Sequence, residues 1–323
     1  VTYYAVNTDE QALTESFADN KIQIGERTTK GLGAGANPEI GQKSAEESED
    51  IIRNSLEGAD LAFITCGMGG GTGTGASHII ARIAKDLGIL VIGVVTKPFS
   101  FEGKVRKNNA ELGIQLIREH VDALVVIPND KLLQVSTQNT TFRDAFKMAD
   151  EVLMMGVRGI TELISTPALI NLDFADVKTI VKDAGLAHMG MGVGTGANKA
   201  VEAARAAISS PLLETSIDGA TGVLMNITGG EELTLFDIQN IAEVIREGAH
   251  PDANVIMGAC IDPKLDDEIR VTVIATGFSE KPVQVQKTQK VVIEKKPTYQ
   301  INPRTLNVDD EDDLAREYGV LSI

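Results

Sequence analysis

The most constraining feature of the chain is an eleven-residue run, GMGGGTGTGAS (67–77), in which six positions are glycine and two are threonine. Without side chains, backbone N–H groups can approach a ligand closely. The run follows an apolar segment, LAFITCG (61–67), and leads into a helical pattern, GASHIIARIAKDLG (75–88). A glycine-rich turn between a buried strand and a helix N-terminus is typical of phosphate binding. A tight turn without a ligand is the alternative interpretation.

The segments after this run alternate short β-branched stretches with helical periods. Strands are expected over 89–95 and 123–128, with a helix over 105–119 between them. Alternation of this kind predicts an α/β fold with a parallel sheet that carries helices on both faces. A longer helical pattern covers 142–165 and ends before STP (165–167).

The second half of the sequence changes character and predicts a separate, smaller α/β unit. Its expected helices cover 173–185, 197–209 and 234–247, and its expected strands cover 222–230, 254–261 and 269–277.

The last part of the chain has the composition of a flexible tail. Residues 281–308 carry six basic side chains and one acid, whereas residues 309–323 carry six acids and one base. Such a segment buries too little apolar surface to order itself.

Charge and composition exclude several classes of function. A net charge of −16 and a pI of about 4.7 argue against binding to nucleic acid or to an anionic membrane. No apolar stretch reaches 18 residues, so direct membrane insertion is not expected. Cys66 and Cys260 are expected to be free thiols in a reducing compartment. The four histidines are scattered, and no set of metal-ligating side chains is predicted.

Comparison with known phosphate-binding motifs limits which kind of phosphate ligand the glycine run could bind. A P-loop is excluded because Gly103-Lys104 is followed by valine rather than by serine or threonine. Gly71, Gly73 and Ala76 fit the G-x-G-x-x-A spacing of a dinucleotide site, but the next strand ends in VVTKPF without the acid that would bind the ribose. An NAD(P)-dependent oxidoreductase therefore remains an alternative, but the chain lacks the ribose-binding acid that would support it.

A second glycine-rich loop, KGLGAGANPEIG (30–41), lies in the same predicted domain. Two such loops suggest a polyphosphate that is held from two sides. A flexible surface loop is the simpler alternative.

These motifs together resemble a known family. GGGTGTG (69–75) is the signature of tubulins and FtsZ, and the chain is similar to the FtsZ family of bacterial, tubulin-like cell-division GTPases over about residues 1–280. The similarity extends through AVNTDEQAL (5–13), VVTKPFSFEG (94–103) and NLDFADVK (171–178), and through KGLGAGANPEIG, IPNDKLL (127–133) and DAFKMADEVL (144–153).

The resemblance implies a tubulin-like, Rossmann-type GTPase domain with a long connecting helix and a smaller α/β C-terminal domain. The implied boundaries are 1–141 for the GTP-binding domain, 142–166 for the connecting helix, 167–280 for the C-terminal domain with the catalytic loop at its start, and 281–323 for the tail. The family also implies a cytoplasmic protein at the division site.

The resemblance further implies a site for GTP or GDP with Mg²⁺. A carboxylate suits guanine because the base offers an N1–H and an amino group side by side, a pair that adenine lacks. The implied contacts are Gly70, Gly71, Thr72 and Gly73 for the α- and β-phosphates, Ala34, Gly35, Ala36 and Asn37 for the γ-phosphate, Glu102 and Arg106 for the ribose, Asn129, Asp150 and the stacking Phe146 for guanine, and Asn7 and Asp9 near the phosphates and Mg²⁺.

Catalytic positions are implied at Asn171, Asp173 and Asp176. The two acids are three residues apart and share one face of the helix that they open. Helix capping explains them without any catalytic role. In the family, however, this loop reaches the nucleotide of the next subunit and polarises the attacking water. Head-to-tail contacts that do not close produce a filament, so hydrolysis would follow assembly.

Two departures from the family pattern qualify these expectations. The family has a further strand, glycine-rich loop and helix before the residues that match Val1. We therefore expect this chain to bind GTP weakly or not at all, with a non-hydrolysing fragment that binds or poisons filaments as the alternative. The tail ends in DDEDDLAREYGVLSI and lacks the Pro and Phe-Leu of the family's peptide, which argues against its usual membrane tethers and regulators.

Overall fold

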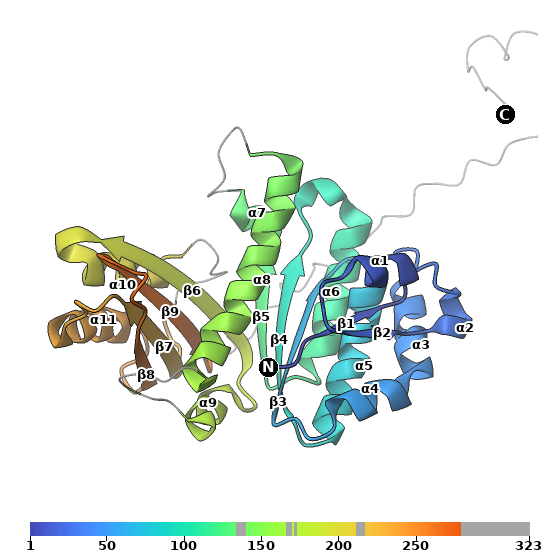
Figure 1. Cartoon of the computed structure of the whole chain (residues 1–323), viewed down its shortest axis with the longest axis horizontal. Coiled ribbons are helices and arrows are strands. Elements are labelled where there is room, and N and C mark those ends of the chain that lie inside the picture. Colours follow the sequence, from blue (N-terminus) through green and yellow to red (C-terminus); the bar gives the residue numbers. More distant parts are fainter. Residues whose placement is uncertain (134–139, 166–169, 171–172, 211–216, 279–323) are drawn as a thin grey trace, which may run out of the picture. The chain divides into compact units, whose positions relative to one another are not determined.

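A computed structural model describes residues 1–133, 140–165, 170, 173–210 and 217–278 (Figure 1). The predicted tail over 281–323 lies outside the described residues, as does residue 166, the last that the resemblance assigns to the connecting helix.

The main sheet has seven strands and is mostly parallel, as predicted. The first three strands and the start of the fourth run parallel, whereas β9 pairs antiparallel with both of its neighbours. The spatial order is β3 (Leu61–Gly67), β4 (Leu90–Lys97), β5 (Ala123–Pro128), β6 (Gly185–Thr195), β9 (Glu268–Thr276), β7 (Gly222–Gly229) and β8 (Asn254–Ile261).

Strand β4 is covered on both faces, which explains its continuous apolar sequence. Its odd-numbered residues Val91 and Val95 pack with helices α5 (Thr72–Asp86) and α6 (Lys104–Arg118). Its even-numbered residues Ile92 and Val94 pack with the long helix α8 (Phe142–Ser165). This alternation places side chains on opposite faces of the strand and confirms the predicted layers.

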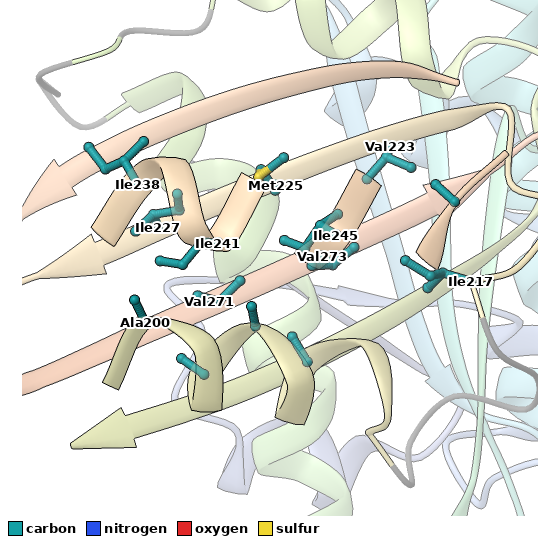
Figure 2. Packing of buried hydrophobic residues seen from close by; sticks show 14 of the residues in the cluster. Ala200, Ile217, Val223, Met225, Ile227, Ile238, Ile241, Ile245, Val271 and Val273 are labelled. Carbon is teal, nitrogen blue, oxygen red and sulfur yellow. The ribbon is translucent and has the colours of Figure 1, made fainter. Parts of the chain in front are cut away.

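The second part of the sheet has its own apolar core, shown in Figure 2. Helices α10 (Lys199–Ile208) and α11 (Leu235–Gly248) pack on β7 and β9. Labelled side chains from the strands and helices meet between them, among them Met225, Val271 and Ile241. The isoleucines of α11 recur at helical spacing, so one face of this helix is buried.

The sequence prediction was wrong between residues 182 and 196. It extended one helix to residue 185, but α9 (Phe174–Val181) is short and the eleven-residue strand β6 follows it. The strand escapes detection because it is rich in glycine, which is uncommon in strands. The glycines permit a close contact with α10. A Cβ on Gly192 would lie 2.0 Å from the carbonyl oxygen of Ala203, and a Cβ on Gly194 would lie 2.0 Å from that of Lys199, the first residue of α10.

Strand β6 also joins the two parts of the sheet. Its first residues, Gly185–Ala187, pair with β5, and His188–Thr195 pair with β9. The predicted smaller α/β unit therefore shares a continuous sheet with strands β3, β4 and β5 of the first half of the chain.

The first sixty residues form short elements that the sequence prediction does not include. Strands β1 (Tyr4–Asn7) and β2 (Asn20–Gln23) make a separate two-stranded parallel sheet, and among the described residues β3 is an edge strand of the main sheet. The helices here are α1 (Glu10–Glu15), α2 (Glu26–Thr29), α3 (Pro38–Glu47) and α4 (Glu49–Leu56).

Two further predictions concern single features. Cys66 and Cys260 are free cysteines, as expected. Within the described part of the chain, every helix is too short or too polar to cross a bilayer.

A buried carboxylate, Asp122, ties α5, β4 and the start of β6 together. Its Oδ1 accepts hydrogen bonds from Lys85 Nζ at 2.7 Å and from Asp183 N at 3.3 Å, and its Oδ2 accepts one from Val91 N at 2.8 Å. Its own carbonyl accepts from Gly185 N at 3.0 Å. Burial raises the pKa of Asp122, but the hydrogen bonds from Lys85 and Val91 outweigh it and hold that pKa below its usual range.

Replacing Asp122 with alanine is expected to lower the free energy of unfolding by about 2–3 kcal/mol, because three donors lose their acceptor. The folded-state pKa is depressed, so this contribution is present above about pH 4 and is lost as the pH falls through the folded-state pKa. Urea unfolding between pH 7 and pH 3 measures both effects.

Asp183→Asn is the control, because Asp183 is an exposed partner of the same lysine and lies 3.8 Å from it. It should cost less than about 1 kcal/mol. An Asp122→Ala difference that is as large at pH 3 as at pH 7 would contradict the role of the charge.

Candidate nucleotide-binding site

The glycine run connects the carboxyl end of β3 to the first turn of α5. The helix begins at Thr72, three residues before the predicted start, so the second half of the run is helical. Gly69 has a φ of +105°, and a Cβ there would lie 2.9 Å from the carbonyl oxygen of Arg106. Both features require glycine at this position.

Other glycines of the run are required by the second glycine-rich loop. A Cβ on Gly71 would lie 2.7 Å from Ala34 Cβ and 2.9 Å from Asn37 N. A Cβ on Gly75 would lie 2.0 Å from the carbonyl oxygen of Pro38, in the first turn of α3. The loop 34–37 and the run 69–73 therefore touch through their backbones, side by side as two halves of one site would be.

Gly70 differs from these neighbours. A Cβ on Gly70 would have no described heavy atom within 4 Å, whereas one on Gly73 would lie 2.8 Å from the carbonyl oxygen of Gly67. The backbone at Gly70 is thus open on one side, next to the N-terminus of a fifteen-residue helix whose dipole favours an anion. This arrangement suits a phosphate group.

A third loop, residues 7–9, is joined to both glycine-rich segments. The buried Thr8 places its hydroxyl oxygen 2.6 Å from that of Thr72, and its carbonyl accepts from Gly33 N at 3.2 Å. Asn7 Oδ1 accepts from the backbone of Thr8 at 2.8 Å, and Asp9 caps α1. Asn7 and Asp9 therefore belong to a loop that contacts both glycine-rich segments, and each has structural bonds of its own, while their predicted place near the phosphates and Mg²⁺ stays a prediction.

The predicted ribose residues form an ion pair. Glu102 ends a short 3₁₀ turn after β4, and its carboxylate accepts from Arg106 Nη1 at 2.6 Å and from Phe99 N at 2.9 Å. The Glu102 side chain is nearly buried, whereas Arg106 is half exposed. The pair holds the segment after β4 against the start of α6.

The predicted guanine residues come from α8 and from the end of β5. Asn129 begins α7 (Asn129–Leu132) and is buried, and within the described residues its Oδ1 has no hydrogen-bond partner. Phe146 and Asp150 are one turn apart on α8, and burial raises the pKa of Asp150. The Phe146 ring meets Phe99 edge-on at 5.5 Å between centroids. A buried acceptor without a partner is the feature that a ligand would satisfy.

The predicted catalytic acids cap α9. Asp173 Oδ1 accepts from Asp176 N at 2.9 Å, and Asp176 Oδ2 accepts from Asp173 N at 3.1 Å. This reciprocal capping box confirms the structural explanation of the pair without excluding a second role. Among the described residues, no hydrogen bond or ion pair joins either acid to the glycine-rich loops. Asn171, the third predicted catalytic residue, lies outside the described residues.

Sequence reasoning missed two residues that connect these loops. Thr8 links the first loop to Thr72, and Asn109 of α6 reaches the carbonyl groups of Ala36 and Gly69. Thr8 lies within the segment AVNTDEQAL, but no local pattern indicates the contacts of Thr8 or of Asn109, because their partners are distant in the sequence.

A resident metal centre has no obvious ligand set in the described chain, which holds no cluster of three or more histidine, cysteine, aspartate or glutamate side chains suited to an ion. Asp9 could still contribute one carboxylate, because its side chain lies beside the second glycine-rich loop: a Cβ on Gly33 would lie 3.6 Å from Asp9 Oδ2. Mg²⁺ typically uses one or two carboxylates together with phosphates and water. The residues therefore fit a magnesium ion that arrives with a polyphosphate.

Comparison with known proteins finds two domain families that match successive parts of the chain. Residues 1–137 match the GTPase domain of the Tubulin/FtsZ family, and residues 185–279 match the C-terminal domain of the FtsZ family. Similar solved structures include an empty FtsZ dimer from M. jannaschii, which is 46% identical, covers 85% of this chain and 80% of its own, and has a TM-score of 0.81.

Two further structures extend this comparison. A mutant FtsZ from M. jannaschii is also 46% identical, covers 86% of this chain and 83% of its own, and has a TM-score of 0.82. CetZ1 from Haloferax volcanii, as a GDP-bound monomer, is 23% identical, covers 86% of both chains and has a TM-score of 0.74. The CetZ1 likeness concerns the fold alone.

The glycine contacts predict different outcomes for two alanine substitutions. Gly75→Ala should lower the free energy of unfolding by about 1–3 kcal/mol, because its Cβ would collide with the backbone of α3. Gly70→Ala should change it by less than about 0.5 kcal/mol, because the position is open. Urea unfolding of both variants tests the comparison, and equal stabilities would show that the backbone contact is not needed.

Proposed function

The chain belongs to the tubulin/FtsZ family of GTPases, and from that premise we propose that it binds GTP and assembles head to tail into filaments that hydrolyse the nucleotide at subunit contacts. The proposed setting is the cytoplasmic division site. The observation that carries the proposal is the backbone contact between the loop 34–37 and the run 69–73, with Gly70 open beside the N-terminus of α5.

The phosphates would lie at the glycine-rich segments. Gly70, Gly71, Thr72 and Gly73 would surround the α- and β-phosphates, because the first amides of α5 carry partial positive charge there. Loop 34–37 would meet the γ-phosphate. Its Gly35 and Ala36 both have positive φ, and a Cβ on Gly35 would meet no described atom within 4 Å, so this loop too has an open side.

The guanine would lie against Phe146 and between two polar groups. Asn129 Oδ1 is an acceptor without a partner among the described residues, and a base amino group could supply the missing donor. Asp150 is exposed to solvent as a residue, and the packing around its carboxyl raises the pKa of that group, so a pair of N–H donors from guanine would stabilise its charged form. The Glu102–Arg106 pair would bind the ribose.

Magnesium would be held chiefly by the phosphates, with Asp9 as the nearest carboxylate and Asn7 orienting the loop that carries it. When bound, the ion supplies neutralisation of phosphate charge. The contribution of the chain is to hold the phosphates in place through the glycine-rich amides.

Hydrolysis would require the acids of a neighbouring copy. The capping box uses one oxygen of each carboxylate, and within the described residues the second oxygen of each accepts no hydrogen bond. Asp173 is exposed, and Asp176 is half-buried. These oxygens could accept a proton of the attacking water in the site of the next subunit. The dimeric FtsZ structure supports the self-association that this requires.

Calorimetric titration tests binding directly. GTP should bind in the presence of Mg²⁺, but weakly, as the departure from the family pattern before Val1 leads us to expect, and ATP and NADH should bind at least about tenfold more weakly, because Asp150 and Asn129 offer no matching pair of contacts to adenine. Gly70→Ala should weaken GTP binding at least about tenfold while it leaves stability unchanged, because its methyl group would occupy the open side of the loop. Preferential NADH binding would instead support a dinucleotide enzyme, and no binding by a folded chain would refute the proposal.

Asp173→Asn tests the proposed catalytic role and separates it from capping. Asparagine caps helices as well as aspartate does, so stability should change by less than about 0.5 kcal/mol. GTP binding should be retained, whereas phosphate release should fall by about 10²-fold or more. In the unaltered chain, the rate per subunit should rise with protein concentration. Undiminished turnover in the variant would remove Asp173 from the mechanism, and a rate independent of concentration would refute hydrolysis between subunits.

A further inference from the structure

Asn109 of helix α6 contacts both halves of the proposed phosphate site. Its side-chain nitrogen donates to the carbonyl oxygen of Ala36 at 3.3 Å and to that of Gly69 at 3.5 Å. An amide nitrogen carries two hydrogens, so one side chain can serve both acceptors. The orientation of the amide is fixed chemically, because the reverse orientation would set its oxygen against two carbonyl oxygens.

The two acceptors belong to residues with unusual backbone conformations. Ala36 has a φ of +58°, which is uncommon for a residue with a side chain, and Gly69 has a φ of +105°. For an alanine such a conformation persists only where surrounding contacts maintain it, whereas glycine adopts a positive φ readily. Asn109 is half-buried and sits on a fifteen-residue helix, so it is a fixed point from which both loops can be held.

The position of loop 34–37 matters most for a terminal phosphate. A diphosphate on the run 69–73 need not touch this loop, whereas a third phosphate would. If the loop were free, the third phosphate would have to order it, and part of the binding free energy would be lost. If the loop is already held in place, the contacts of the third phosphate contribute fully to the binding free energy, and the preference for the triphosphate over the diphosphate is larger.

We propose that Asn109 is a positioning residue that ties loop 34–37 to the glycine run and thereby sets how strongly the site distinguishes GTP from GDP. This inference rests on the proposed function, because it assumes that a guanine nucleotide binds there. The tether itself exists in the absence of nucleotide, so it can be tested separately.

The test compares Asn109→Leu with Asn108→Leu in the full chain. Leucine is similar in size to asparagine but donates no hydrogen bond, and Asn108 is an exposed neighbour on the same helix. The first readout is hydrogen exchange of the backbone amides of residues 34–37 without nucleotide. The second is the ratio of the dissociation constants for GDP and for a slowly hydrolysed GTP analogue. Thermal unfolding of each variant checks that the fold is intact.

Asn109→Leu should speed exchange in loop 34–37 by about three- to tenfold and reduce the GDP-to-GTP-analogue ratio by a similar factor, the size expected for one lost hydrogen-bonding group. Asn108→Leu should change neither. Unchanged exchange in Asn109→Leu, or equal effects in both variants, would overturn the tether. Faster exchange with an unchanged ratio would overturn its role in discrimination. If the unaltered chain binds no guanine nucleotide, the proposed function and the role in discrimination both fail, while exchange still decides the tether.

Discussion

The site depends on a contact between two pieces of backbone. A Cβ on Gly41 would lie 2.2 Å from the carbonyl oxygen of Gly71, and one on Gly75 would lie 2.0 Å from that of Pro38. Helices α3 and α5 can approach this closely only because both carry glycine at the crossing. The contact places the loop before α3 beside the loop before α5, so both helix N-termini are near a single ligand position. Close backbone contacts therefore explain Gly69, Gly71, Gly73 and Gly75 of the run, whereas Gly70 is open and is the position in the run where we propose that a phosphate lies.

Long and regular elements were predictable from the sequence, and short or glycine-rich ones were not. Strands β3, β5 and β8 and helix α8 have the predicted bounds, since uninterrupted apolar runs and a sustained helical period leave little ambiguity. Strand β6 was missed because its glycines are required by a tertiary contact with α10, and glycine is uncommon in strands, so local composition does not predict a strand there. The elements before residue 61 span 4–10 residues each, too few for periodicity to identify them.

The residues of the candidate site also differ in how far the sequence predicts them. The glycine run signalled a phosphate loop from local composition alone, but Asp150 and Asn129 entered only through the family resemblance, because one acid or amide on a helix has no distinctive pattern. Neither the residue patterns nor the family resemblance identified Thr8 or Asn109 as a site residue, although Thr8 lies in the segment AVNTDEQAL. Their roles come from hydrogen bonds to residues 64 and 73 positions away, which no local pattern encodes.

Helix α5 extends from the proposed binding site to contacts with the turn between α9, which begins at the proposed catalytic acids, and strand β6. Its N-terminus follows the proposed phosphate loop, and Lys85 near its C-terminus binds Asp122, which also holds the backbone of Asp183 and Gly185. Those residues connect α9, with Asp173 at its start, to β6. A helix of fifteen residues is about 22 Å long and stiff. Helix α5 is thus in contact at its two ends with the glycine run and, through the Lys85–Asp122 pair, with the turn between α9 and β6.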